Sequence, residues 1–235
     1  MSCPHAKIQA SLDRWHEAHW QLHQIEQHYH DPEPFRYSFN AFIRVIKEVQ
    51  QILKMDLQNE RDYHSFIKPL VDTLRQDPLL STLGKKRDFV VHHGMLDIRS
   101  KGTAGSTRGG PKIKMGVEFD VSPQESSDDA FRRFARTCKG HPDFCGLLGL
   151  QDDDLFPCIQ RVWLLQEFDD RDLLELAIAA WRETGTVISK LVEHFGGGAL
   201  DLMLACAPAP EDVRMRKYSR KQFADAMSAL PSSPS

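Results

Sequence analysis

The sequence predicts a mainly α-helical fold with a small β-hairpin or sheet insertion. Apolar residues recur every three or four positions through the first third of the chain and again after residue 170, whereas residues 113–119 alternate apolar and polar. The 235 residues, 41% of them apolar, are enough to bury a core. We expect one domain over residues 1–205, with a helical core at about 6–96 and 168–195, a β-containing insertion at about 97–165, and a basic, Pro/Ser-rich, partly disordered tail at 206–235.

The first two helices are predicted from apolar stripes that run from Ile8 to Tyr29 and from Phe35 to Leu53. The segment "HDPEPF" between them supplies Asp31 as a cap and Pro32 as a first-turn residue. A short connection between two long amphipathic helices predicts an antiparallel pair, because neither helix can bury its apolar face alone.

Two further helices are expected before residue 95. The segment "YHSFIKPLVDTLRQ" is a weaker candidate because Pro69 interrupts it. The next segment, "DPLLSTLGKKRDFVVHHG", has Asp77 to cap the helix, Pro78 for its first turn and Gly94 to end it.

The insertion begins with a Gly-rich segment that predicts a hairpin with an irregular loop at its tip, because Ile113, Met115, Val117 and Phe119 would share one face of a strand. A short helix is expected around "DDAFRRFARTC" and a strand at "PCIQRVWLL". A long helix opened by Asp169 or Asp170 should follow and stop at "FGGG".

The fourth helix carries the pair of residues with the clearest chemical potential. Arg87 precedes His92 by five positions, which separates them by about 140° around a helix. A guanidinium keeps its charge, so Arg87 either pairs with a carboxylate and stabilises a helix junction or contacts a phosphate in a wet cleft. The same spacing recurs at Arg14–His19 and Arg136–His141, but neither copy lies on a late helix that a glycine ends.

The motif "RDFVVH" on a late helix, together with "DPEPFRYSFNAFIRVIKEV" on the second, resembles the HEPN (higher eukaryotes and prokaryotes nucleotide-binding) domain family over about residues 6–96. The resemblance implies a HEPN-like up-and-down helical bundle that forms a homodimer. It further implies a metal-independent endoribonuclease, often the toxin of a toxin–antitoxin pair, whose site is a dimer cleft that includes the fourth helix. An antitoxin-like protein partner is implied as well.

Carried onto this sequence, the resemblance implies that Arg87 holds the scissile phosphate and that His92 acts as general acid or base. Asp88 would orient one of them, and His93 would substitute for His92. Family members without nuclease activity imply the alternative, a non-catalytic module that binds a nucleotide, RNA or a protein partner.

Two basic segments are candidates for phosphate contact. The first contains no acidic residue and supplies five cations among glycines: Arg99, Lys101, Arg108, Lys112 and Lys114. The second, "RMRKYSRK", lies near the C-terminus. Either segment could instead be a solvated surface without a ligand.

No metal or cofactor is expected. The histidines of the first helix (His16, His19, His23 and His30) and the group Cys138, His141 and Cys145 lack a complete ligand set at a familiar spacing. Phosphate-loop and serine-hydrolase fingerprints are absent from the sequence.

Charge and composition set the remaining expectations. The formal net charge of −3 excludes a global basic field, so any binding of nucleic acid must come from local patches. Five scattered cysteines favour free thiols in a reducing compartment. The first residues lack the apolar run of a signal peptide, and no stretch reaches the roughly 20 apolar residues of a membrane span. We therefore expect a cytoplasmic protein without a membrane partner.

Overall fold

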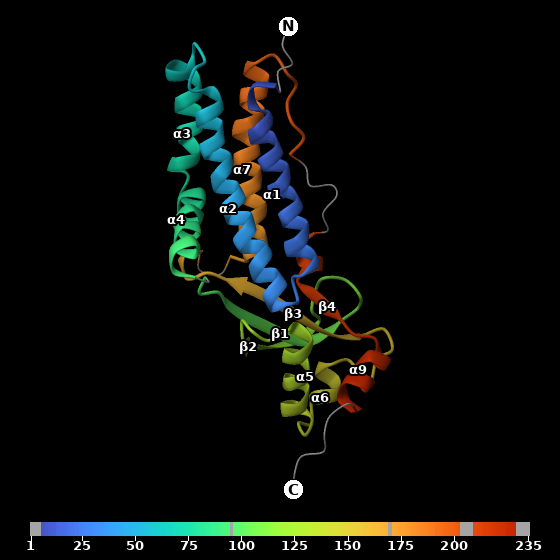
Figure 1. Ribbon diagram of the computed structural model, residues 1–235. Helices are drawn as coiled ribbons and strands as arrows, with labels where there is room; N and C mark the ends of the chain where they lie inside the picture. The colour runs from blue at the N-terminus through green and yellow to red at the C-terminus, as the bar shows by residue number, and fades with distance from the viewer. Residues whose placement is uncertain (1–5, 95, 169–170, 203–208, 229–235) are drawn as a thin grey trace. The chain divides into compact units, whose positions relative to one another are not determined.

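The computed structural model describes residues 6–94, 96–168, 171–202 and 209–228. The chain divides into two compact units, each assembled from segments that are distant in the sequence (Figure 1). The helical unit comprises Met1–Gln27, Pro34–Asp97 and Arg171–Ala207. The sheet unit comprises His28–Glu33, Ile98–Asp170 and Pro208–Ser235.

The helical unit is built from long helices that run alongside one another (Figure 1). Its elements are a 3-10 turn at Ala6–Ile8, α1 (Gln9–Gln27), α2 (Pro32–Leu57), a π-helical turn at Tyr63–Ile67, α3 (Lys68–Gln76), α4 (Pro78–His93) and α7 (Leu173–His194). Helix α1 packs against α7, and α3 packs against both α4 and α7.

The first two helices are antiparallel, as the sequence predicted. The hydroxyl of Ser11, near the start of α1, donates to Asp56 Oδ2 near the end of α2 at 3.2 Å. The predicted apolar stripes are buried, with Leu22 of α1 1% exposed and Phe39 of α2 fully enclosed. Each helix therefore covers the apolar face that it could not bury alone.

Helix α4 begins and ends at the predicted residues. The side chain of Asp77 accepts a hydrogen bond from Leu80 N at 2.8 Å, and Pro78 occupies the first turn. At the other end, Gly94 has φ 114°, a backbone conformation that side-chain-bearing residues rarely adopt. Helix α7 is capped by Asp172, and the expected caps Asp169 and Asp170 lie outside the described residues.

The sheet unit holds a four-stranded antiparallel sheet in the order β2-β1-β3-β4. Its strands are β1 (Arg99–Thr107), β2 (Met115–Val121), β3 (Phe156–Leu164) and β4 (Met215–Lys217). Its helical elements are α5 (Ser127–Cys138), α6 (Phe144–Leu147), a 3-10 turn at Gln166–Phe168, α8 (Pro210–Val213) and α9 (Arg220–Ser228). The prediction of a mainly helical protein with a small β-sheet is confirmed.

The core of the sheet unit joins the sheet to α5, α6 and α9. Phe131 of α5 stacks on Tyr218 with ring centroids 4.4 Å apart and meets Phe223 of α9 edge-on. Part of the segment expected to be a tail therefore contributes a strand and two helices, from Pro210 to Ser228. Residues 229–235 lie outside the described part of the chain.

Candidate anion-binding groove

The predicted catalytic residues lie at the end of α4 in the helical unit. Arg87 Nη1 lies 3.0 Å from Asp88 Oδ1, and the Arg87 side chain is 24% exposed. Its Nε is buried without a hydrogen-bond partner among the described residues. His92 is exposed, whereas the side chain of His93 lies outside the described residues.

Arg87 and His92 are not directed toward one another by the helix that carries them. The helix continues unbroken from Pro78 to His93, so five positions separate the two side chains by about 140° around its axis. Asp88 pairs with Arg87 itself. This contact matches the structural alternative, in which Arg87 is held by a carboxylate.

The five predicted phosphate-binding cations fall at two ends of one hairpin. Arg99 and Lys101 begin β1 and line a cavity of about 650 Å³ that also includes Asp120. Arg108, Lys112 and Lys114 are exposed in the loop after β1. Strand β1 has nine residues, so about 30 Å separates its two ends and the five cations do not form one cluster.

The loop at residues 108–114 is held by a backbone hydrogen bond from Lys114 N to the Ser106 carbonyl at 2.8 Å and by contacts of one hydroxyl. Thr107 Oγ1 lies 2.8 Å from the carbonyl oxygen of Gly110 and 2.9 Å from that of Lys112, and Gly109 has φ 96°. Since the turn is held from its base, the exposed cations of this loop project from an ordered backbone.

The second basic segment folds back onto this loop. In β4, Lys217 lies opposite Cys158 of β3, and the start of β3 lies opposite the end of β1. As a result, Lys217 Nζ donates a hydrogen bond to the carbonyl oxygen of Gly109. Two basic segments 108 residues apart in the sequence thus meet at one end of the sheet.

A cavity of about 800 Å³ lies beside this contact, between α5, β4 and α9, and we call it the basic groove. Four cations and two carboxylates line it, together with aromatic and other side chains. These residues are Arg132, Arg136, Arg216, Lys217, Asp128, Asp225, Phe131, Tyr218, Met215 and Gln222.

Helix periodicity aligns the α5 contribution to the groove. Asp128, Arg132 and Arg136 are spaced four residues apart, so they form one column along the helix. Helix α5 starts cleanly because Ser126 caps it, accepting a hydrogen bond from Asp129 N at 3.1 Å.

One of the two groove carboxylates is already engaged. Asp128 accepts a two-pronged contact from Arg216, at 3.2 Å to Nε and 3.1 Å to Nη2, and a 2.7 Å hydrogen bond from the hydroxyl of Tyr218. Burial, with Asp128 adding to it, raises the pKa of Tyr218 far above its usual value, so this hydroxyl stays protonated and donates. Asp128 thus pairs with Arg216, and Asp129 pairs with Arg132 at 2.8 Å. The excess positive charge of the groove therefore comes from Arg136 and Lys217.

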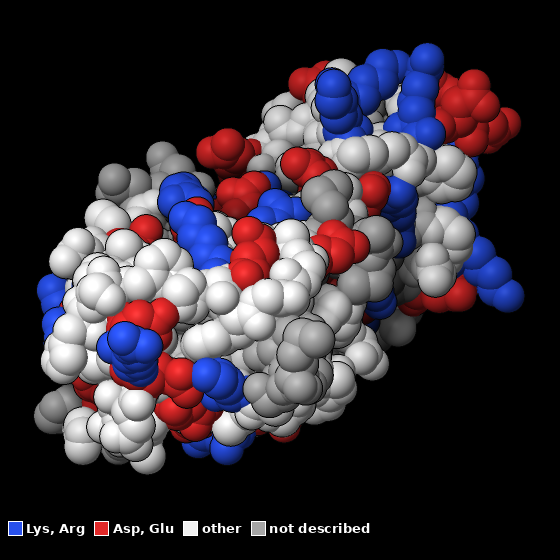
Figure 2. All heavy atoms as spheres, turned by 90° about the horizontal axis from the view of Figure 1, so that it is seen from above, with Lys and Arg blue, Asp and Glu red and all other residues white. Residues whose placement is uncertain are grey.

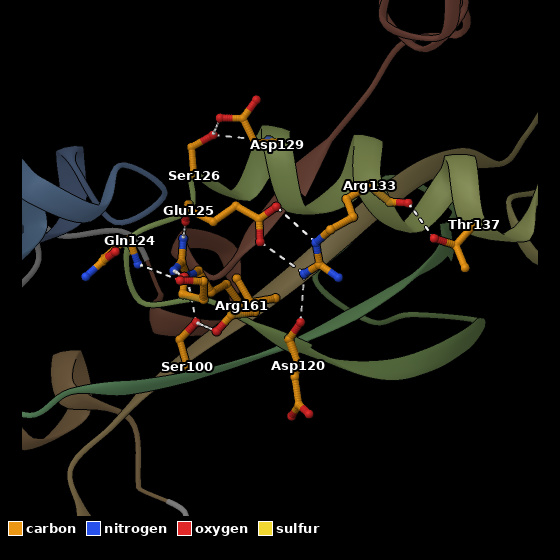
Figure 3. A network of polar contacts seen from close by, with 11 residues as sticks. Ser100, Asp120, Gln124, Glu125, Ser126, Asp129, Arg133, Thr137 and Arg161 are labelled. Atoms are coloured by element: carbon orange, nitrogen blue, oxygen red, sulfur yellow. Dashed lines mark hydrogen bonds and ion pairs between the residues drawn. The ribbon is translucent and has the colours of Figure 1, made fainter. Parts of the chain in front are cut away.

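A buried arginine supports the strand and loop beneath α5. Arg161 of β3 is fully buried, and it donates to Ser100 Oγ at 3.2 Å, to the Glu125 carbonyl at 2.7 Å and to the Ser122 carbonyl at 3.0 Å (Figure 3). Its guanidinium also lies 3.6 Å from the centroid of the Trp163 ring. Burial lowers the pKa of Arg161 to about 10, which still leaves it charged at neutral pH.

Sequence reasoning missed Arg161 and the α5 column. A single arginine within the apolar run of β3 was a signal for a buried cation, because a strand that is buried on both faces leaves no exposed side for a charged residue. The four-residue spacing of Asp128, Arg132 and Arg136 was a signal for one helix face.

The histidines of α1 and the group Cys138, His141 and Cys145 lie in different units. Within the described ranges, no group of three or more His, Cys, Asp or Glu residues could hold a metal ion. The rings of His19 and His23 instead lie against one another at a tilt, with centroids 4.7 Å apart. Cys138 and His141 both line an apolar cavity in the sheet unit.

Charges of both signs are interspersed over the face of the molecule shown in Figure 2. This distribution agrees with the formal net charge of −3, and it leaves local groups of cations as the means of attracting an anion. None of the helices in the described ranges is long and apolar enough to cross a membrane.

Comparison with known proteins corrects the predicted family. The model of the family described as bacteriophage lambda protein ea47 matches residues 1–201. No curated protein matches the chain, and no solved structure does. The HEPN assignment was therefore wrong: it depended on the segment "DPEPFRYSFNAFIRVIKEV" and on an Arg–His spacing that occurs three times in this chain, at Arg87, Arg14 and Arg136. With 201 of 235 residues matched, the chain belongs to the bacteriophage lambda protein ea47 family.

Proposed function

We propose that the sheet unit binds nucleic acid through the phosphate backbone, at the basic groove and the adjoining loop 108–114. The observation that carries this proposal is the hydrogen bond from Lys217 to the Gly109 carbonyl, which joins two basic segments into one surface. The cytoplasmic location expected from the sequence would give the protein access to such a ligand.

Several features favour a backbone ligand over a small anion. The cations are spread over a groove of about 800 Å³ and an adjoining loop, so they suit a chain of phosphates rather than one. Phe131 and Tyr218 are buried against one another and line the groove with little exposed ring. Contacts made mainly by cations fix position and affinity but do not read bases. We therefore expect weak sequence preference and strong dependence on salt.

The geometry supports the non-catalytic alternative better than RNA cleavage. The guanidinium of Arg87 pairs with Asp88 on its own helix, and His92 lies about 140° away around that helix. Cleavage at these residues stays a prediction, and the binding experiment can test it with the same probe.

The experiment is a titration of the full-length protein into fluorescently labelled 20-nucleotide RNA and DNA at several salt concentrations. A doubly substituted variant, Arg136→Gln with Lys217→Gln, should raise Kd at least about ten-fold at moderate salt. It should also reduce the salt slope by roughly 0.7–0.9 for each phosphate that the variant no longer neutralises. Comparing RNA with DNA shows which of them supplies the backbone.

The matched control removes the same charge from the helical unit. Arg44 of α2 and Lys85 of α4 are exposed, so Arg44→Gln with Lys85→Gln should leave both the affinity and the salt slope unchanged. A third variant, Arg99→Gln with Lys101→Gln, tests whether the far end of β1 takes part. Equal losses of affinity in the groove variant and the helical-unit control, or no loss in the groove variant, would overturn the proposal.

Cleavage is scored by recovering the RNA after binding. Intact RNA bound by the wild-type protein supports a binding module. Metal-independent cleavage that His92→Ala abolishes without loss of fold would instead establish the enzyme.

A further inference from the structure

The edge strand β2 presents an exposed seven-residue segment. In the described part of the chain, β2 pairs only with β1 and forms one edge of the sheet. Two of its apolar side chains are largely exposed, Met115 at 52% and Val117 at 46%. An edge strand with free backbone groups and exposed apolar side chains is a template for pairing with another strand.

An apolar cavity of about 690 Å³ adjoins this edge. Phe119 contacts Phe134 of α5 with ring centroids 4.9 Å apart, so the odd-numbered residues of β2 face α5. Met115 and Val117 share that face and line the cavity together with Phe134, Phe144 and Leu147. A strand added beside β2 would cover these side chains.

Arg133 indicates which part of the edge is open. Its Nη2 donates to the Asp120 carbonyl at 2.8 Å, and its guanidinium lies 5.7 Å from the centroid of the Phe119 ring (Figure 3). A carbonyl that accepts from an α5 side chain is directed away from β1, and in an antiparallel ladder alternate residues share this orientation. The backbone groups of Gly116 and Glu118 therefore also point to the open edge, while the Asp120 end is covered by Arg133.

We propose that β2 pairs antiparallel with β2 of a second copy of this chain, forming one continuous sheet through both copies. This inference does not rest on the proposed nucleic-acid binding, although Lys114 belongs to both surfaces. A two-fold axis near Gly116 would set Lys114 of each copy opposite Glu118 of the other and leave the Asp120 end, which Arg133 covers, outside the pairing.

Charge complementarity and side-chain alternation select this occupant. Two cation–carboxylate pairs form at once in the antiparallel arrangement, whereas parallel pairing would put Glu118 beside Glu118 and Asp120 beside Asp120. In the same antiparallel arrangement, Met115 and Val117 meet apolar residues of the other copy on the face toward α5. A slip by one residue would place them on the wrong face.

The test is sedimentation of the full-length protein over a wide concentration range, with two charge-reversal variants. Lys114→Glu and, separately, Glu118→Lys should each weaken self-association about ten-fold or more, since both ion pairs become like-charge contacts. An equimolar mixture of the two variants should restore dimers, because each variant then meets the opposite charge at both positions.

A charge-matched control, Lys221→Glu on α9, should dimerise like the wild-type protein. Circular dichroism of every variant establishes that the fold is kept. The proposal would be overturned if the wild-type protein stayed monomeric or if the mixture failed to associate. It would also be overturned if neither variant weakened the dimer, as expected if α4 formed the interface.

Discussion

In the helical unit, Trp15 of α1 and Trp181 of α7 stack with ring centroids 4.4 Å apart, and each indole N–H donates to the backbone carbonyl of the other residue, at 3.1 and 3.3 Å. In the sheet unit, the corresponding central group is the guanidinium of Arg161, which donates to Ser100 and to two loop carbonyls. The helical unit thus pairs the buried N–H groups of two neutral aromatic side chains with backbone carbonyls. The sheet unit instead buries a charged side chain.

This difference indicates which substitutions should destabilise each unit. A neutral indole pair loses one hydrogen bond and some contact area when one ring is changed. Arg161 makes several buried hydrogen bonds at once, so its removal takes a donor from Ser100 Oγ and from the Glu125 carbonyl together. The Ser122 carbonyl, which also accepts from Arg161, keeps its bond from Glu125 N at 3.0 Å. We therefore expect the sheet unit to lose most stability when one polar residue is replaced. The helical unit should lose most stability when apolar packing is removed.

The largest effect is expected for Arg161→Met. The substitution keeps much of the side-chain volume but removes the donor to the Glu125 carbonyl and to Ser100 Oγ, and we expect it to lower the free energy of unfolding of the sheet unit by about 3 kcal/mol, since each buried acceptor left without a donor costs about 1–3 kcal/mol. Denaturant unfolding gives the size of the loss, and hydrogen exchange read by mass spectrometry should place it in peptides of the sheet unit.

Arg133 supplies the matched control because it also makes three hydrogen bonds near the same loop, two to the Glu125 carboxylate and one to the Asp120 carbonyl (Figure 3). Its side chain is 50% exposed, so Arg133→Gln should cost less than about 1 kcal/mol. Equal losses of stability for the two arginines would contradict the contrast between a buried and an exposed guanidinium.

Features that depend on neighbouring residues could be predicted from the sequence, whereas features that depend on distant residues could not. Apolar periodicity and the signals Asp77, Pro78 and Gly94 define α4 because capping and helix spacing are local properties of the chain. Strand β2 was also predicted from local alternation and β3 from the segment "PCIQRVWLL", whereas β1 extends through part of the Gly-rich segment that was expected to form the loop of a hairpin. Strand β4 has three residues, too few to show a pattern, and it is held by pairing with distant β3.

The candidate groove was only partly predictable for a related reason. Both basic segments are visible in the sequence, but the contact between Lys217 and Gly109 follows from strand order, which no local spacing encodes. The pair Arg87–His92 differs from this contact because it was chosen for its spacing along one helix. A contact with a distant part of the chain played no part in that choice. Short spacings of common residues recur by chance, and the family match overturned the resemblance that this one suggested.

A smaller effect is expected from pH, again in the sheet unit. Burial, with nearby Arg216 second, lowers the pKa of His30 to about 4, and His30 Nδ1 lies 2.8 Å from Ser127 Oγ. The unfolded chain binds a proton at a higher pH than the folded protein does. Stability is therefore complete above about pH 6.5 and falls as the pH drops toward 4, by on the order of 2–3 kcal/mol.

The measurement is the free energy of unfolding against pH for the wild-type protein and for His30→Gln, which keeps a side chain able to bond Ser127. Carboxylates that titrate near pH 4 affect both proteins, so the difference between the two curves isolates His30. The free energy of unfolding of the wild type minus that of His30→Gln should fall by on the order of 2–3 kcal/mol as the pH drops from about 6.5 to 4, and parallel curves would show that burial does not lower the pKa of His30.

The smallest effect compares equivalent helix caps in the two units. Asp77 caps α4 in the helical unit through Leu80 N, and Ser126 caps α5 in the sheet unit through Asp129 N. Replacing either residue by alanine should cost about 1 kcal/mol, because each substitution exposes one unpaired N–H at a helix start.

The two substitutions should differ in how far the loss of stability spreads. Ser126 follows Glu125, whose carbonyl accepts from buried Arg161, so Ser126→Ala should also raise hydrogen exchange in β3 peptides around Arg161. Asp77→Ala should raise exchange only in the first turns of α4. If both substitutions raised hydrogen exchange only in the helix that each residue caps, the loop that Arg161 holds would be independent of α5. The stability of the sheet unit would then not depend on its buried cation in the way that the contacts indicate.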